Sequence, residues 1–398
     1  MNPEDLKYWL ALMSVEGVGD TLFGPLLERF GSPAAVFSAS VHELAAVPKM
    51  SKKISQTILA FNDWDGILRQ IDGLNKAGIR IVTFLDESYP RHLLNVYDRP
   101  VLLYVAGHLH SDDISIAIVG SRHASTYGKY TTDRISRELA LRGATIVSGM
   151  ARGIDSCAHR GALAANGRTI AVLGSGLDVI YPPENKKLFE AIVEQGAVIS
   201  EYPPGTQPLP FHFPARNRII SGISYGVLVV EAGEKSGSLI TAKLAMEQGR
   251  EVFAIPGPID SASSRGANHL IKQGAKLIDS VDDILEEILP QLERTAREPV
   301  SPDRKATQTG SEQPYPQKNG VPERAVLEKN VETLLPTDRK ILKAIADGKT
   351  HADDIIQTVR EEFGEGNQFC KKVTYRVSND KTDTEGNVIE KGERSEER

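Results

Sequence analysis

The sequence predicts an α/β protein built on a parallel, doubly wound sheet with smaller helical regions on either side in the chain. The prediction rests on short apolar segments of strand length, on longer segments with helical periodicity between them, and on glycines that follow several of those helical segments. Strands and helices that alternate at this spacing are typical of a parallel sheet. The expected strands of this series are residues 116–119, 145–148, 169–173, 197–200, 227–230 and 251–255.

The chain begins with short helices, and we expect residues 1–65 to form a helical domain. Apolar residues recur three and four apart, and Gly17 and Gly19 mark a tight turn before a helix that Asp20 or Thr21 would cap. This pattern resembles a helix-hairpin-helix or SAM-like unit. It leaves open whether the hairpin contacts phosphates or only packs, because the next turn lacks paired glycines.

The sheet domain is expected to span residues 66–290. Two β-branched segments, residues 79–84 and 101–105, precede the regular series and are also predicted strands. The predicted helices between strands are residues 127–141, 155–165, 185–195, 239–248 and 268–273.

The composition changes abruptly after residue 289. Residues 291–330 are rich in Pro, Gln, Thr, Lys and Glu, so we expect a disordered linker. Helical periodicity returns in residues 331–362, which we interpret as two helices of a partial winged-helix region. Residues 363–398 are polar and charged, and we expect a disordered tail. The sequence leaves the function of this last part open.

The bulk composition limits the class of protein. A chain of 398 residues exceeds the size of a single core, and no segment approaches the roughly 18–20 apolar residues of a membrane span. The N-terminus lacks a signal sequence and the only cysteines are Cys157 and Cys370, so we expect a cytoplasmic protein. Because the formal charge is −6, contact with nucleic acid would need a local positive patch.

The loops that follow the strands hold the candidate site. In a doubly wound sheet, ligands bind at the carboxyl ends of the strands, where helix amino termini expose N–H groups. Glycine, hydroxyl and guanidinium groups gather in these loops, and such groups bind phosphate without reading base identity. The candidate DNA-binding residues are Gly120, Ser121, Arg122, Arg152, Gly153, Phe213, Arg216, Asn217, Arg218, Lys235, Ser236, Gly237 and Ser238.

A site for a single strand would also need aromatic side chains, because each base that stacks on one contributes about 1–3 kcal/mol. The candidates are Phe211, Phe213, Tyr127 and Tyr181. The proline-rich surroundings of Phe211 and Phe213 favour exposure. The sequence does not decide which of the four stack on bases and which lie in the core.

Familiar catalytic patterns are missing from the sequence. Residues 174–179 have the first two glycines of a dinucleotide fingerprint but Val179 in place of the third, and no P-loop pattern occurs. Cys157 and His159 are two apart on a predicted helix and would point to different faces, so we expect His159 to be a packed or capping residue. No ligand spacing indicates a metal. We therefore predict a protein that is not an enzyme and that holds no cofactor or metal.

Six ordered motifs within residues 116–275 resemble the DprA/Smf family of DNA-processing proteins. A looser resemblance extends to the N-terminal helices and to the helix pair near residue 340. The motifs are IVGSR at 118–122, SGMARGIDSCAH at 148–159, VLGSGLD at 172–178 followed by Tyr181-Pro182, FPARNRIISG at 213–222, SGSLITA at 236–242 and IPG at 255–257.

The resemblance implies an extended Rossmann-like domain that binds single-stranded DNA, forms homodimers and helps to load RecA onto strands covered by single-strand-binding protein. It points to residues 120–122 and 216–218 as strand contacts. Some family members end in a winged-helix domain, a pattern from which residues after about 362 depart here. The dimer and RecA interfaces stay open.

Two other functions fit a similar core. One is a nucleotide hydrolase of the LOG or lysine-decarboxylase-like type, whose members carry a PGGxGTxxE pattern that residues 231–241 lack. The other is an adaptor protein whose loops bind a nucleotide instead of a strand. We expect neither to account for the whole set of motifs.

Overall fold

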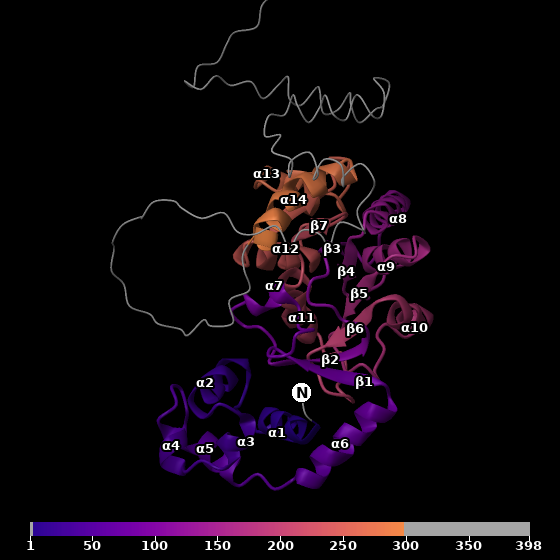
Figure 1. Ribbon diagram of the computed structural model, residues 1–398. Coiled ribbons are helices and arrows are strands. Elements are labelled where there is room, and N and C mark those ends of the chain that lie inside the picture. The colour runs from indigo at the N-terminus through magenta and orange to yellow at the C-terminus, as the bar shows by residue number, and fades with distance from the viewer. Residues whose placement is uncertain (1–2, 298–398) are drawn as a thin grey trace, which may run out of the picture. The chain divides into compact units, whose positions relative to one another are not determined.

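Nine strands form one sheet in the computed structural model, which describes residues 3–297 (Figure 1). The strand order is β1-β2-β6-β5-β4-β3-β7-β8-β9. The strands are β1 (Ile79–Thr83), β2 (Leu102–Gly107), β3 (Ser115–Val119), β4 (Thr145–Ser148), β5 (Thr169–Val172), β6 (Ala197–Ser200), β7 (Gly226–Val229), β8 (Glu251–Ala254) and β9 (Lys276–Leu277).

The central part of the sheet is parallel. Strands β3 to β8 are the six of the predicted regular series, and each pairs in parallel with its neighbours within that set, as the sequence indicates. Strands β1 and β2 were also predicted; β2 pairs antiparallel with β6, and β1 pairs antiparallel with β2 at the edge of the sheet. The two-residue strand β9 at the opposite edge was not predicted, because so short a strand has no periodic pattern.

Helices cover both faces of the sheet. Ile116 and Ile118 of β3 pack in a core with α8 and α9, whereas Ala117 and Val119 face the opposite core. The first face carries α6 (Trp64–Lys76), α8 (Thr126–Leu141), α9 (Ile154–Ala164), the 3₁₀ helix η1 (Pro183–Asn185), α10 (Lys186–Gln195) and α14 (Val281–Arg297). The second face carries α7 (Arg91–Leu94), α11 (His212–Gly222), α12 (Ser238–Glu247) and α13 (Arg265–Lys272).

Two segments differ from the sequence-based expectation. Residues 213–218, expected in a loop, lie in α11, because Pro214 falls in the first turn, where a helix tolerates proline. Helix α14 extends to Arg297, so the first seven residues of the expected linker are helical. The rest of that linker, the expected winged-helix pair and the tail lie outside the described residues.

The N-terminal helices have a core of their own, as predicted for a SAM-like domain. They are α1 (Pro3–Ser14), α2 (Asp20–Phe30), α3 (Pro33–Phe37), α4 (Val41–Ala45) and α5 (Lys52–Leu59). Trp9 stacks on Phe23 in this core, and Gly17 adopts a φ of +93° in the predicted turn. The expected cap is wrong, since Gly19 occupies the N-cap position and Asp20 is the first helical residue.

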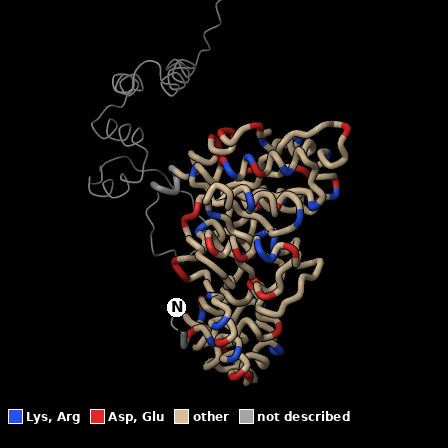
Figure 2. Tube along the Cα trace, turned by 90° about the vertical axis from the view of Figure 1, so that its right-hand side faces the viewer, with Lys and Arg blue, Asp and Glu red and all other residues tan. Residues whose placement is uncertain are grey.

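Charges of both signs are distributed along the trace (Figure 2). In the part of the chain that the structure describes, no one element holds all the charges of one sign. None of the described helices is long and apolar enough to span a membrane.

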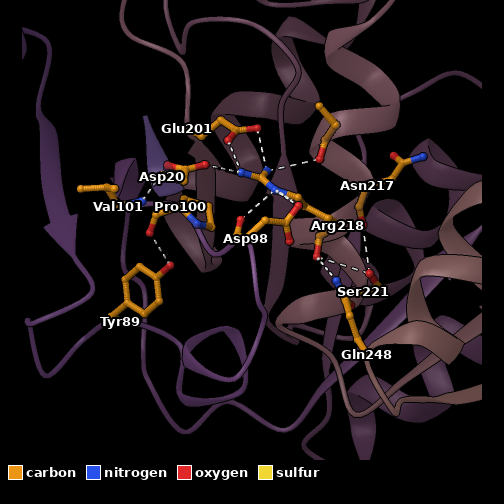
Figure 3. A network of polar contacts seen from close by, with 11 residues as sticks. Asp20, Tyr89, Asp98, Pro100, Val101, Glu201, Asn217, Arg218, Ser221 and Gln248 are labelled. Atoms are coloured by element: carbon orange, nitrogen blue, oxygen red, sulfur yellow. Dashed lines mark hydrogen bonds and ion pairs between the residues drawn. The ribbon is translucent and has the colours of Figure 1, made fainter. Parts of the chain in front are cut away.

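Arg218 of α11 joins the N-terminal domain to the sheet (Figure 3). Its guanidinium donates to Asp20 at 3.0 Å and to both carboxylate oxygens of Glu201 at 2.7 and 2.9 Å, and it also contacts Asp98. Burial lowers the pKa of Arg218, but the charges of Glu201 and Asp20 outweigh burial and raise it. Arg218 was expected to contact DNA; instead it is buried against carboxylates, so its charge serves the fold.

His159 of α9 is fully buried, in line with the expected packed role. Thr169 donates its hydroxyl proton to the Ile146 carbonyl, so His159 Nδ1 is the donor in the 2.7 Å contact with Thr169 Oγ1. His159 Nε2 has no partner among the described residues. Burial, with a smaller contribution from Arg216, lowers the pKa of His159 to about 3.

We expect Arg218→Ala to lower the free energy of unfolding by about 3–5 kcal/mol, because it leaves partly buried carboxylates without their counter-charge. Urea unfolding at neutral pH measures this loss. Arg142→Ala is the control: Arg142 forms an exposed ion pair with Asp282, so its loss should cost less than about 1 kcal/mol. Equal losses for the two variants would contradict the assignment.

Stability should fall as the pH drops from about 6.5 towards 4, because His159 binds a proton in the unfolded chain but not in the folded one. Each pH unit in this window costs up to about 1.4 kcal/mol for this one group. His159→Asn removes the titration and should flatten the dependence of the unfolding free energy on pH. Parallel profiles for the variant and the wild type would show that another group is responsible.

Candidate nucleic-acid interface

A pocket of about 760 Å³ lies at the carboxyl ends of the central strands. Strand β3 continues through α8 to β4 on one side, and β7 continues through α12 to β8 on the other, so the chain diverges between β3 and β7. Doubly wound sheets bind ligands at such a point. The predicted contact residues that line the pocket are Gly120, Ser121, Arg122, Phe213, Arg216, Asn217, Lys235, Ser236, Gly237 and Ser238.

The loop after β3 forms one wall. Ser121 N donates to the Glu231 carbonyl at 2.7 Å, and Ile154 N donates to the Ser121 carbonyl at 3.1 Å, so this loop is fixed to the ends of β7 and α9. The guanidinium of Arg122 is exposed at the end of this wall. Gly153 has a φ of +75°, and a Cβ there would lie 2.2 Å from the Ser121 carbonyl oxygen. Gly153 therefore shapes the wall and does not line the pocket.

Arg216 forms the floor of the pocket. Arg216 is only 4% exposed. It donates to the carbonyl of Gly149, which follows β4, at 2.8 Å, and to the carbonyl of Val172, the last residue of β5. Burial lowers the pKa of Arg216 to about 10, against the opposing charge of Asp155. Arg216 was expected to present an open guanidinium to DNA. Nη1 instead donates to these two backbone carbonyls and Nε donates to Asn217 Oδ1 at 3.3 Å, so much of the guanidinium is held within the protein.

Asp155 balances this buried charge. Its carboxylate accepts hydrogen bonds from Gly149 N at 3.1 Å and Ala151 N at 3.3 Å. Burial raises the pKa of Asp155, while Arg216 opposes that rise. A Cβ on Gly149 would lie 2.6 Å from Arg216 and 2.8 Å from Asp155, so glycine leaves room for the pair. The site prediction omitted Asp155, although its position two residues after Gly153, in the first turn of a helix at a strand end, was a usable signal.

An aromatic ring and two guanidinium groups meet at the pocket. The Phe213 ring centroid lies 5.5 Å from Arg122 Cζ and 5.9 Å from Arg216 Cζ, within the range of cation–π contact. The centroid of the Tyr181 ring lies 5.7 Å from the centroid of the Phe213 ring. Phe213 and Tyr181 line the pocket, whereas Phe211 and Tyr127 lie outside it.

The start of α12 forms another wall of the pocket. Lys235 is exposed, and the hydroxyls of Ser236 and Ser238 lie 2.8 Å from each other. Gly237 is the N-cap residue. The first N–H groups of the helix are already used, because Ser238 N donates to Ser236 Oγ at 3.4 Å and Leu239 N donates to the Ser236 carbonyl at 3.1 Å. Ser238 is the first residue of this helix.

Arg152 lies outside the pocket. It is exposed and pairs with Glu184 at 2.5 Å. Among the described residues, no three His, Cys, Asp or Glu side chains are grouped as metal ligands would be.

Comparison with known proteins identifies the family. The model of the DNA recombination-mediator protein A family matches residues 80–289, more than half of the chain. The chain belongs to this family. A SAM-like helix-hairpin-helix tandem matches residues 10–61 in addition.

Relatives of the DNA recombination-mediator protein A family match over long segments. Protein Smf of Synechocystis is 37% identical over 373 residues, which cover 92% of this chain and 94% of that protein. DNA processing protein DprA of Streptococcus pneumoniae is 51% identical over 206 residues, which cover 52% of this chain and 73% of that protein. The X-ray structure of the latter protein matches with a TM-score of 0.62 at 39% identity, covering 71% of this chain and 97% of that one. The resemblance expected from the motifs is confirmed.

The match to the DNA recombination-mediator protein A family contains every residue that lines the pocket. The pocket is therefore part of the domain that defines the family and not of the regions on either side.

Gly153→Ala should lower the free energy of unfolding by more than about 1 kcal/mol, because alanine is strained at positive φ and its Cβ would displace the Ser121 carbonyl. Chemical denaturation measures the loss. Gly237→Ala is the matched control, since no atom lies within 4 Å of its Cβ position and its φ is −61°. Equal stabilities for the two variants would contradict the role of Gly153.

Proposed function

We propose that the protein binds single-stranded DNA in the pocket between β3 and β7 and acts as a recombination mediator. The observation that carries the proposal is the convergence of Arg122, Lys235, the Phe213 ring and the amino end of α12 on one pocket. Cations bind phosphate, and an aromatic ring stacks on a base. Together they fit a nucleotide unit of a polyanion.

A single strand fits this arrangement better than a duplex. The Phe213 ring lies inside a concave site, where only an unpaired base can present its face to it. Arg122 and Lys235 line the pocket from two different loops as exposed cations, so more than one phosphate of the strand can be neutralised. None of the contacts reads a base edge, so we expect little sequence preference.

The proposed mode of action is binding without chemistry. Within residues 3–297, Asp155 is the one acidic side chain that lines the pocket. It is buried and its carboxylate already accepts hydrogen bonds from Gly149 N and Ala151 N, which leaves it poorly placed to act as a free base. Release of free base from a nucleoside monophosphate would overturn this part of the proposal.

The cellular role proposed here is help in loading a RecA recombinase onto DNA, by a homodimer in the cytoplasm. Support comes from the family description as a recombination mediator and from the name of the pneumococcal relative, a DNA processing protein. RecA filaments that form on protein-covered strands no faster with this protein than without it would contradict the role.

Binding of labelled oligo-dT and of matching duplex across a salt series tests the site. We expect tighter binding of the single strand and a negative slope of log affinity against log salt. Arg122→Ala should weaken binding and reduce the magnitude of the slope by about 0.7, the share of one phosphate contact on a single strand.

Arg142→Ala serves as the control for charge, because Arg142 follows α8 at the opposite end of that helix and pairs with Asp282. It should leave the slope near the wild-type value. An Arg122→Ala slope that equals the wild-type slope would remove Arg122 from the phosphate contacts, and stronger binding of duplex would overturn the choice of ligand.

A further inference from the structure

We infer that the bound strand continues from the pocket onto the outer faces of α8 and α9, where Lys129, Tyr130 and Arg160 form a second contact surface. We call these three residues the α8–α9 track. The inference rests on the proposed function, since it extends the path of the same single strand.

The track begins at the wall of the pocket. Helices α8 and α9 lie side by side on one face of the sheet (Figure 1), and both start at the carboxyl ends of strands. At the first residues of α9, the Cβ position of Gly153 touches the backbone of Ser121 and Arg122. Two turns further on, the Cβ position of Gly161 lies 2.8 Å from the Asp133 carbonyl oxygen, so the helices stay in close contact. A DNA strand that leaves Arg122 therefore meets the surface where α8 and α9 are in contact.

Lys129 lies one turn before Asp133 on α8, and Arg160 directly precedes Gly161 on α9, so the two exposed cations lie near the contact between the helices. Between them lies Cys157, a half-buried residue of α9. Burial raises the pKa of the Cys157 thiol, and the positive charges of Arg160 and Lys129 both oppose that rise. The charge of Asp133, which pairs with Arg137, adds to the rise. From Gly153 to Arg160 the helix advances by seven residues, about 10 Å, so the cations lie within a few phosphates of the pocket.

The positive charge of the surface where α8 and α9 are in contact is uncompensated only at its end near the pocket. Further along α8, Arg134 pairs with Glu138 at 3.6 Å, and Arg137 pairs with Asp133 at 3.1 Å. Lys129 and Arg160 are exposed and form no ion pair with any of the residues between 3 and 297. A phosphate can displace water and counter-ions from them without first breaking an ion pair.

Tyr130 adds the aromatic component. It follows Lys129 on α8, and its side chain is 69% exposed. A large ring that is exposed beside unpaired cations is the combination that binds single strands, because bases stack on the ring while phosphates meet the charges. The track thus repeats the chemistry of Phe213 with Arg122 at a second position along the same path.

The length of the DNA distinguishes the track from the pocket. Oligo-dT of about 6 nucleotides should occupy the pocket alone, and oligo-dT of about 20 nucleotides should also reach the track. In the full-length protein, Lys129→Ala/Arg160→Ala should reduce the magnitude of the salt slope by about 1.4 for the long oligonucleotide, twice the share of one contact, and leave the short one unchanged. Tyr130→Ala should weaken only the binding of the long oligonucleotide, and Tyr130→Phe should restore it.

Arg91→Ala/Lys272→Ala is the matched control. It removes one arginine and one lysine from exposed positions on α7 and α13, which cover the opposite face of the sheet, and should keep the wild-type slope for both lengths. A track variant that binds the long oligonucleotide like the wild type, or that loses the same slope with both lengths, would overturn the track while leaving the pocket in place. Wild-type protein that binds neither length would overturn the proposed function as well.

Discussion

The buried guanidinium of Arg216 is the interaction on which the site depends. It holds the carbonyls at the ends of β4 and β5 from a helix on the far side of the pocket, and Asp155 balances its charge. A buried arginine is tolerated only with such partners, so the loops after β4 and β5 and the start of α11 have to keep their positions together. The pocket therefore has a rigid floor, while the groups that can reach a ligand, Arg122 and Lys235, stand on its walls.

The strand pattern of the sheet could be predicted from the sequence, and the direction of its side chains could not. Strands such as Ile116–Val119 are buried on both faces and appear as continuous apolar segments, so their length and alternation with helices identify them. Arg216 and Arg218 of α11 both look like candidate DNA contacts in the sequence. Arg216 and Arg218 turn inward because carbonyls and carboxylates from distant segments surround them, and no local pattern contains those partners.

The limits of the site prediction follow the same physics. Residues in strand-end loops, such as Ser121 and Lys235, were found because topology alone brings those loops to one edge of a parallel sheet. Arg152 has the same loop position but is held by Glu184, a partner thirty-two residues away. The track residues belong to helix faces, where an exposed lysine or arginine is ordinary unless the ion pairs around it are known.

Helix α11 also links two regions that the sequence presents as separate. Asn217 lines the pocket, and its neighbour Arg218 is shared by Asp20 of the N-terminal domain and Glu201 after β6. A ligand that shifts this helix even slightly changes the distances between those carboxylates and their common cation. The N-terminal domain is thus held to the same helix that lines the pocket, although none of its own residues lines it.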